Sequence, residues 1–341
     1  MTTTLPITPA LPSDGVREAE TSAPNQDVTR SHRWLATGAS VVAGAVAILA
    51  LTPETAWAWT PGTHIFLSDA VLRSLVLLPA GVAALLRDYP FDFLYGSIAA
   101  DTSMAKKYAA EGRHCHAWHV GLEIRDRARD DALRAFGFGY LAHLAADTVA
   151  HNYFVPMQLA RTATTSAIGH SYWESRFETH LPGDAQLRAR DVILFDHSRA
   201  DEHLDRILSP TLFSTGTNRR IFRGMVRAAD NENWQRVFQM LVERSRWDLD
   251  TGIVREHLVR SFDYVIDFLA RDEAAEPFAL DPSGDVALRE AKRVRRAAIR
   301  EGGPAAADRT GRRAFELPPT SLAYASTLRA PLYVGSRAAS S

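Results

Sequence analysis

Residues 133–153, with the sequence LRAFGFGYLAHLAADTVAHNY, form the stretch that decides the fold. Apolar residues recur here at three- and four-residue spacing, which predicts a buried helix that ends at Pro156. His143, Asp147 and His151 interrupt the apolar run at four-residue steps. Each step turns an α-helix by about 400°, so the three side chains share one face and span about 12 Å along the axis.

This spacing has two interpretations. The three side chains could be polar groups that are hydrogen-bonded inside a core, or they could serve two metal centres that lie on either side of a shared carboxylate. Unpaired polar groups in an apolar environment each cost several kcal/mol. Three of them in a helix made mainly of Leu, Ala, Phe, Gly and Val favour the metal centres.

The chain beyond residue 59 is mostly helical in pattern and has no run of alternating strands. We therefore predict an all-α fold, a multi-helix single domain with a metal cluster in its helical core. Residues 89–101 should form a short helix or turn that delivers Asp101 inward. Further helices are expected at residues 67–86 with a break at Pro79, and at 117–129, 168–181, 200–208, 218–229, 234–246, 254–271 and 286–300.

Two further clusters carry ligand-type side chains. His170 and Glu174 have the four-residue spacing that lets a helix hold one divalent ion. A second cluster, at residues 113–119, contains three histidines around Cys115, and His116 is the preferred ligand there, with His114 next. Cys115 could itself bind zinc as a thiolate, although a small, partly buried thiol is the simpler interpretation.

The composition excludes several classes of partner and structure. The formal net charge of −1 gives no global basic field to attract nucleic acid or an anionic membrane. Cys115 is the only cysteine, so the chain has no internal disulfide.

The N-terminal region is typical of an export signal. An apolar, uncharged run at residues 34–51 follows basic residues, and Ala56 and Ala58 provide the small-x-small cleavage pattern. We expect cleavage after Ala58 and release to the periplasm or the exterior; the alternative is an uncleaved membrane anchor through residues 34–51. The expected segments are a disordered preamble at 1–29, a signal peptide at 30–58, a helical domain at 59–275, and a charged helix with a disordered tail at 276–341.

Cleavage at this position would create a chemical group that the precursor lacks. Trp59 would become the mature N-terminus, and its free amine and carbonyl can form a five-membered chelate. His64, five residues later, adds an imidazole. We therefore hypothesise that processing builds a metal ligand.

Taken in order, these residues resemble the ligands of the bacterial zinc-dependent phospholipases C, which are related to the fungal single-strand-specific zinc nucleases. The most literal similarities are His-x-x-x-Asp at residues 143–147 and Gly-His-Ser-x-x-Glu at residues 169–174, and the resemblance covers about residues 59–178. It implies three zinc ions and this ligand set: Trp59, His64, Asp101, His116, His143, Asp147, His151, His170 and Glu174.

The resemblance also implies how the ligands divide and what they do. The first zinc would be held by Asp101, His116, His143 and Asp147. The second would be held by Trp59 and His64, with Asp147 bridging these two ions. The third would be held by His151, His170 and Glu174. Asp101 would be the general base. The implied activity is hydrolysis of phospholipid to diacylglycerol and a phosphorylated head group by a zinc-activated water. We expect a monomer that acts at a membrane surface, with no stable nucleic acid partner; the alternatives are a zinc nuclease for single strands and a non-catalytic, membrane-anchored metal-binding protein.

Overall fold

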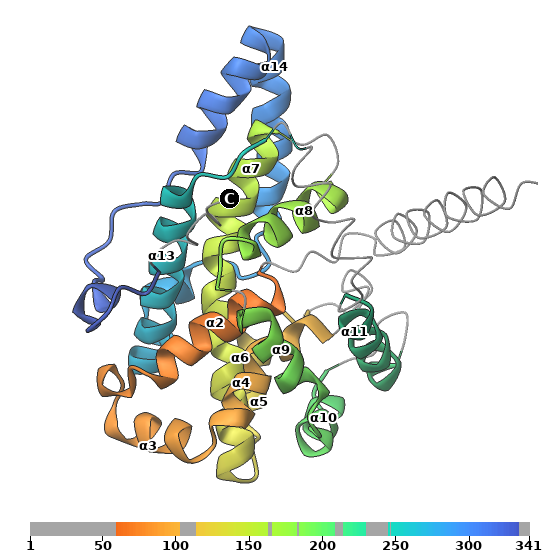
Figure 1. Cartoon of the computed structure of the whole chain (residues 1–341), viewed down its shortest axis with the longest axis vertical. Helices are drawn as coiled ribbons and strands as arrows, with labels where there is room; N and C mark the ends of the chain where they lie inside the picture. The colour runs from red at the N-terminus through yellow and green to blue at the C-terminus, as the bar shows by residue number, and fades with distance from the viewer. Residues whose placement is uncertain are drawn as a thin grey trace, which may run out of the picture. The chain divides into compact units, whose positions relative to one another are not determined.

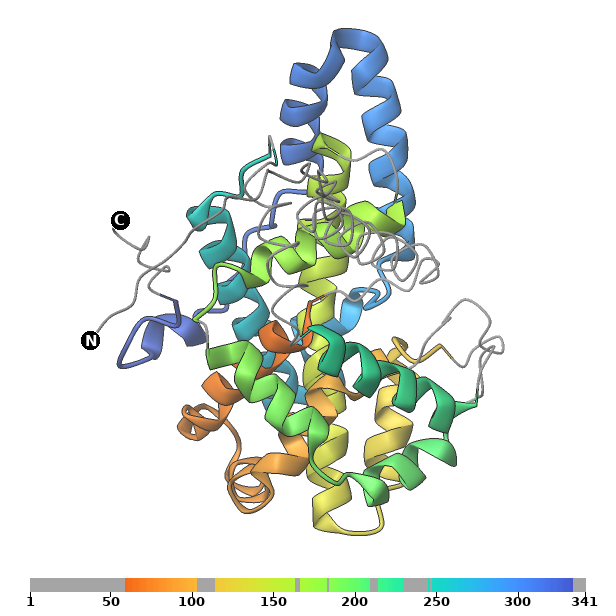
Figure 2. The ribbon, with the colours of Figure 1, turned by 45° about the vertical axis from the view of Figure 1, so that its right-hand side comes forward.

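The computed structural model describes residues 59–102, 114–162, 166–182, 184–208, 214–229, 245 and 247–333. Every regular element in these ranges is a helix, which confirms the all-α prediction (Figures 1 and 2). Residues 1–58, and with them the expected preamble and signal peptide, lie outside the described residues, as does nearly all of the helix expected at 234–246. Within the described ranges, no helix combines the length and the apolarity needed to cross a bilayer.

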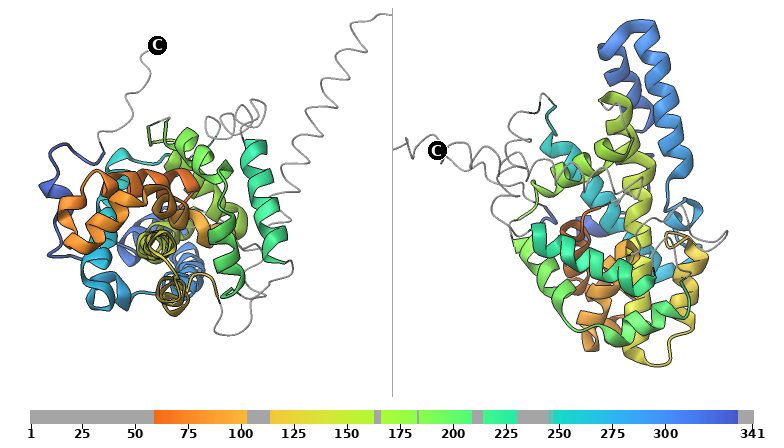
Figure 3. Two further views of the ribbon diagram at one scale, coloured as in Figure 1. Left: turned by 90° about the horizontal axis from the view of Figure 1, so that it is seen from below. Right: turned by 90° about the vertical axis from the view of Figure 1, so that its right-hand side faces the viewer.

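Helix α6 (Asp131–Val149) is the central element of the fold. It begins where the carboxylate of Asp130 accepts a hydrogen bond from the backbone N–H of Leu133 at 3.0 Å. Helices α4 (Pro90–Ala99), α5 (Trp118–Asp126) and α13 (Thr251–Arg271) pack around it, and Figure 3 shows it nearly end-on among them. Almost all of its side chains beyond the first turn are buried, because its apolar and small residues occur on every face.

Helices α4 and α6 approach so closely that their backbones touch. A Cβ atom on Gly96 of α4, or on Gly139 of α6, would lie 2.1 Å from a carbonyl oxygen of the other helix. Only glycine fits at either position. This crossing places the end of α4, and the 3-10 turn Ala100–Thr102 that follows it, beside the metal-binding part of α6. The turn carries Asp101, which is fully buried as predicted.

We expect Gly139→Ala to destabilise the protein by at least about 1–3 kcal/mol, because the added methyl group must push two helix backbones apart. Gly81→Ala in α3 (Ala80–Asp88) is the matched control, since its Cβ would meet no atom within 4 Å. Denaturant unfolding of both variants checks this. Equal midpoints for the two variants would contradict the close crossing.

The prediction that the helix ends at Pro156 is wrong, because the chain remains helical beyond this residue. Helix α6 continues through a π-helical turn, Ala150–Phe154, into helix α7, Val155–Arg161. Pro156 lies in the first turn of α7, a position where a missing N–H is tolerated. Single π-turns inside helices are frequent at functional sites, and this one carries His151.

The remaining helices are α2 (Pro61–Leu72), α8 (Ser166–Glu178), α9 (Asp184–Leu194), α10 (Ser198–Asp205) and α11 (Thr215–Ala229). Helices α2 and α10 contact α6, whereas α8 packs against α7 and α11 packs against α9 and α10. Helix α9 was not predicted, and it packs against α2 and α4. Pro79 separates two helices as expected, with a short 3-10 turn at Leu75–Leu77 before it.

The structure describes the C-terminal part of the chain up to residue 333, whereas the helical domain was predicted to end at residue 275. Helix α14 (Asp285–Ala314) folds back on itself at Gly302 and Gly303 and packs along α7 (Figure 2). Its buried residues are small, such as Ala307 and Gly311. Contacts made by small side chains in a highly charged helix leave no apolar pattern in the sequence.

Candidate metal centre

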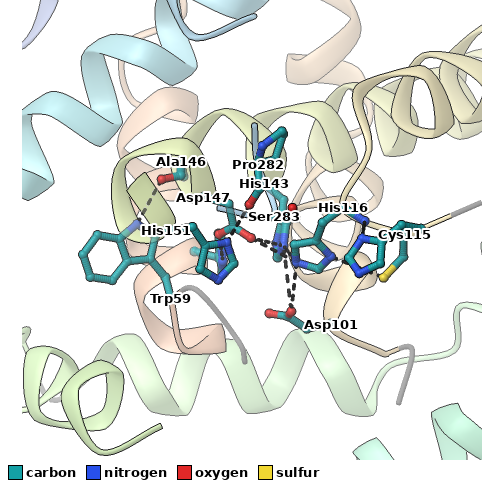
Figure 4. Close-up of polar contacts among 12 residues, drawn as sticks. Trp59, Asp101, Cys115, His116, His143, Ala146, Asp147, His151, Pro282 and Ser283 are labelled. Carbon is teal, nitrogen blue, oxygen red and sulfur yellow. Dashed lines mark hydrogen bonds and ion pairs between the residues drawn. The ribbon is translucent and has the colours of Figure 1, made fainter. Parts of the chain in front are cut away.

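The candidate ligand side chains come from different elements and meet in the core. Figure 4 shows Asp101, His116, His143, Asp147 and His151 among them. Helix α6 supplies His143 and Asp147, and α8 supplies His170 and Glu174. All eight histidine and carboxylate side chains of the predicted set are at most 3% exposed. Their ligand atoms form three groups in which all atoms lie within 4.8 Å of one another: His64, Asp101 and His143; His116, His143 and Asp147; and His151, His170 and Glu174.

The first centre contains four ligand atoms at the spacing of a zinc site. His116 Nε2 lies 3.0 Å from Asp147 Oδ2, 3.2 Å from His143 Nε2 and 3.5 Å from Asp101 Oδ1. His143 Nε2 lies 3.1 Å from Asp147 Oδ2 and 3.9 Å from Asp101 Oδ1. With zinc–ligand bonds of about 2.0–2.2 Å, the ligand atoms of a tetrahedral site lie about 3.3–3.6 Å apart. These residues therefore fit a zinc ion.

The hydrogen bond on the far side of His143 fixes which of its nitrogens faces this centre. Nδ1 lies 2.9 Å from the backbone carbonyl of Ser97. A carbonyl can only accept, so Nδ1 carries the hydrogen and the neutral ring presents a lone pair at Nε2. That lone pair points at the carboxylate of Asp147 and at His116 Nε2. A metal cation placed between His143, His116 and Asp147 can bind all three acceptor groups at once, whereas one proton can be shared by only two of them.

The protonation states also suit metal binding. Burial and the neighbouring His143 lower the pKa of His64, so its imidazole is neutral. Burial alone would raise the pKa of Asp147, but its polar contacts with His143, His116 and His64 outweigh burial and hold that pKa well below its usual range. A neutral imidazole and an ionised carboxylate are the forms that bind zinc.

The second centre lies on the side of Asp147 that carries the Oδ1 atom. Its Oδ1 lies 3.2 Å from His64 Nε2, whereas Oδ2 faces the first centre. The ring of His64 stacks on His143 with centroids 3.9 Å apart. Trp59 is fully buried nearby, and its indole Nε1 donates to the carbonyl of Ala146 at 3.2 Å. Its backbone nitrogen is an amide in the full chain, because Ala58 precedes it.

The third centre lies at the junction of the π-turn and α8. His170 Nε2 and Glu174 Oε1 are 2.6 Å apart, and the ring of His151 lies edge-on to His170 with centroids 5.3 Å apart. Nδ1 of His151 donates to the carbonyl of Pro282 at 2.6 Å. By the same reasoning as for His143, Nε2 is the nitrogen that remains for a metal.

The structure places His114 and His116, the two alternative ligands predicted from the sequence, in different positions. The Nε2 atom of His116 lies in the first centre, whereas His114 Nδ1 accepts a hydrogen bond from the backbone N–H of His116 at 3.1 Å. Cys115 Sγ lies 3.3 Å from His116 Nδ1 and so contacts the side of the ring away from the first centre. Geometry thus favours His116 as the ligand, with His114 supporting its backbone.

One residue near the site was missed in the sequence. Glu178 is partly buried one turn after Glu174, and it accepts hydrogen bonds from the backbone N–H groups of Gly62 and Thr63 at the start of α2. Burial raises its pKa to about 7, because the hydrogen bonds only partly offset the loss of solvation. Its carboxyl group caps the helix that carries His64. The four-residue step from Glu174 was the only available signal.

Comparison with known proteins agrees with this geometry. A family model described as zinc dependent phospholipase C matches residues 63–209. Residues 63–209 are therefore similar to the zinc-dependent phospholipase C family. The match confirms the resemblance and contains every candidate ligand except Trp59. No curated protein and no solved structure gives a match.

Proposed function

We propose that this protein is an exported phospholipase C that uses three zinc ions and releases diacylglycerol from phospholipid. The observation that carries the proposal is the placement of Asp147. Its two carboxylate oxygens face different sets of imidazoles, at 3.2 Å from His64 on one side and at 3.0 Å from His116 on the other. A carboxylate shared in this way suits two adjacent metal ions, the arrangement used to hydrolyse phosphodiesters.

The roles of the residues follow from their positions. Zinc, when bound, lowers the pKa of water and neutralises charge on a phosphodiester. We assign Asp101 to orient the attacking water and accept its proton, because its carboxylate is fully buried and lies 3.5 Å from His116 Nε2. The histidines would hold the ions, and the backbone carbonyl of Ser97 keeps His143 in the orientation that this requires.

Two aromatic side chains support a lipid substrate over a nucleic acid. Single-stranded nucleic acid needs accessible aromatic faces on which bases can stack. Trp173 is 1% exposed and donates to Thr162 Oγ1 at 3.0 Å. The ring of Trp118 stacks on Phe268 with centroids 4.8 Å apart. Trp118 and Trp173 are therefore both engaged in contacts within the fold.

The proposal predicts that the chain beginning at Trp59 releases diacylglycerol from phospholipid vesicles, and that Asp101→Asn lowers the rate by about 100- to 10,000-fold, the contribution typical of a positioned general base. Asp131→Asn, a change on the exposed surface of α6, is the control and should leave the rate unchanged. Assays on vesicles and on single-stranded DNA, run side by side, check this. Cleavage of DNA without lipid hydrolysis would indicate a nuclease, and full activity of Asp101→Asn would contradict the assigned role.

A further inference from the structure

A short segment from outside the family-matched region lies directly against the third centre. Residues 280–284, with the sequence LDPSG, connect the last 3-10 turn before α14 to that helix, and we call them the strap. Three consecutive carbonyl groups of the strap accept hydrogen bonds from side chains of the metal-binding region. The donors are Trp118 Nε1 to Leu280 at 2.8 Å, Asn152 Nδ2 to Asp281 at 2.8 Å and His151 Nδ1 to Pro282 at 2.6 Å.

The hydrogen bond from His151 to the Pro282 carbonyl orients one of the candidate metal ligands. His151 lies on a π-turn, where backbone hydrogen bonding is less regular than in an α-helix. Its ring is therefore oriented chiefly by what it contacts. The carbonyl of Pro282, drawn beside His151 in Figure 4, holds the hydrogen on Nδ1. Nε2 is then directed to the third centre, whose other members are His170 and Glu174. Such outer partners of ligating histidines set both the tautomer and the ring orientation.

Gly284 brings the strap close enough to make this hydrogen bond. Its φ of +62° is a left-handed conformation that glycine adopts without strain. A Cβ atom at this position would lie 2.4 Å from His151 Cβ and 2.5 Å from the His151 carbonyl oxygen. Only glycine allows this approach.

The strap is also held in shape by its own side chains. The carboxylate of Asp281 accepts hydrogen bonds from the backbone N–H of Ser283 at 2.9 Å and from its hydroxyl at 2.7 Å. Asn152 ties the same segment to the π-turn, because its amide also donates to the carbonyl of Thr148 at 2.8 Å. The position of the Pro282 carbonyl is therefore set both by contacts within the strap and by the hydrogen bond between the strap and Asn152.

From these contacts we infer that the strap is a positioning element of the third metal centre, so that a segment beyond residue 275 completes the site. This inference rests on the proposed function. It assigns no direct ligand to the strap, which acts only through His151. Loss of an outer hydrogen-bond partner of this kind weakens metal affinity by about 10–100-fold.

The test compares substitutions of two glycines that both have a positive φ. Gly284 lies directly before α14, and Gly303 lies at the kink inside that helix. Gly284→Ala should push the strap away from His151, whereas Gly303→Ala introduces backbone strain at φ +69° with no atom within 4 Å of its Cβ. Zinc titration and zinc counting after dialysis are measured on both variants of the chain beginning at Trp59. We expect one of three zinc ions to bind about 10–100-fold more weakly in Gly284→Ala alone.

Asn152→Ala is the second variant, in case Gly284→Ala fails to fold; it removes one tether of the strap and should weaken the same zinc ion. Unfolding of the metal-free proteins separates this effect from a general loss of stability. Three zinc ions of unchanged affinity in the folded strap variants would overturn the inference while leaving the proposed function intact. A wild-type chain that binds no zinc would instead overturn the proposed function itself.

Discussion

Replacing Asp147 with asparagine is expected to release two of the three zinc ions and to lower phospholipid hydrolysis by at least about 1000-fold. The physical reason is that both carboxylate oxygens are in use, Oδ1 toward His64 and Oδ2 toward His116 and His143. Asparagine keeps the shape but removes the charge and one acceptor. The expected loss exceeds the 10–100-fold effect of changing an outer partner, because a shared ligand of two ions is removed.

The matched control is Asp267→Asn in α13. Asp267 is also fully buried, and it accepts hydrogen bonds from the backbone N–H of Glu276 at 2.7 Å and from Arg271 at 3.2 Å, away from the candidate ligands. Its substitution should lower stability by about 1–3 kcal/mol and leave the zinc content unchanged. If Asp147→Asn and Asp267→Asn retain the same zinc content, the bridging role is wrong.

A single extra residue before Trp59 is expected to remove one zinc ion and to lower the hydrolysis rate by at least about 100-fold. The extra residue converts the α-amine into an amide, which does not bind zinc at neutral pH, and only His64 and Asp147 remain for the second centre. The two chains, one beginning at Ala58 and the other at Trp59, otherwise have the same sequence. Zinc analysis and vesicle hydrolysis on both provide the measurement.

Trp59→Phe with a free N-terminus is the control for this comparison. It keeps the amine but loses the indole hydrogen bond to the Ala146 carbonyl. We expect three zinc ions in this variant, with a small loss of stability. Equal zinc content in the chains beginning at Ala58 and at Trp59 would show that the amine is not a ligand.

Much of the site could be predicted because helical spacing leaves a direct trace in the sequence. His143 and Asp147 share one face of α6, and His170 pairs with Glu174 at 2.6 Å on α8, both at the predicted four-residue step. The buried position of Asp101 also followed from the pattern of the preceding segment. These features depend only on local geometry and on which side chains bind metal.

The features that escaped prediction are made by backbone groups and small residues. The carbonyls of Ser97 and Pro282 accept hydrogen bonds from two of the candidate ligands, and a carbonyl belongs to every residue type. The α4–α6 crossing depends on glycines, and α14 packs through alanines and Gly311. The π-turn that carries His151 has no side-chain signature at all. Long-range contacts of this kind become visible only in the folded chain.

We expect the chain beginning at Trp59 to hold three zinc ions in its helical core. The decisive measurement is metal analysis of that chain, purified without chelator and related to protein concentration. About three zinc ions per chain are expected, and a chelator should remove them together with phospholipid hydrolysis. Less than one zinc ion per chain, or hydrolysis that survives complete removal of metal, would contradict it.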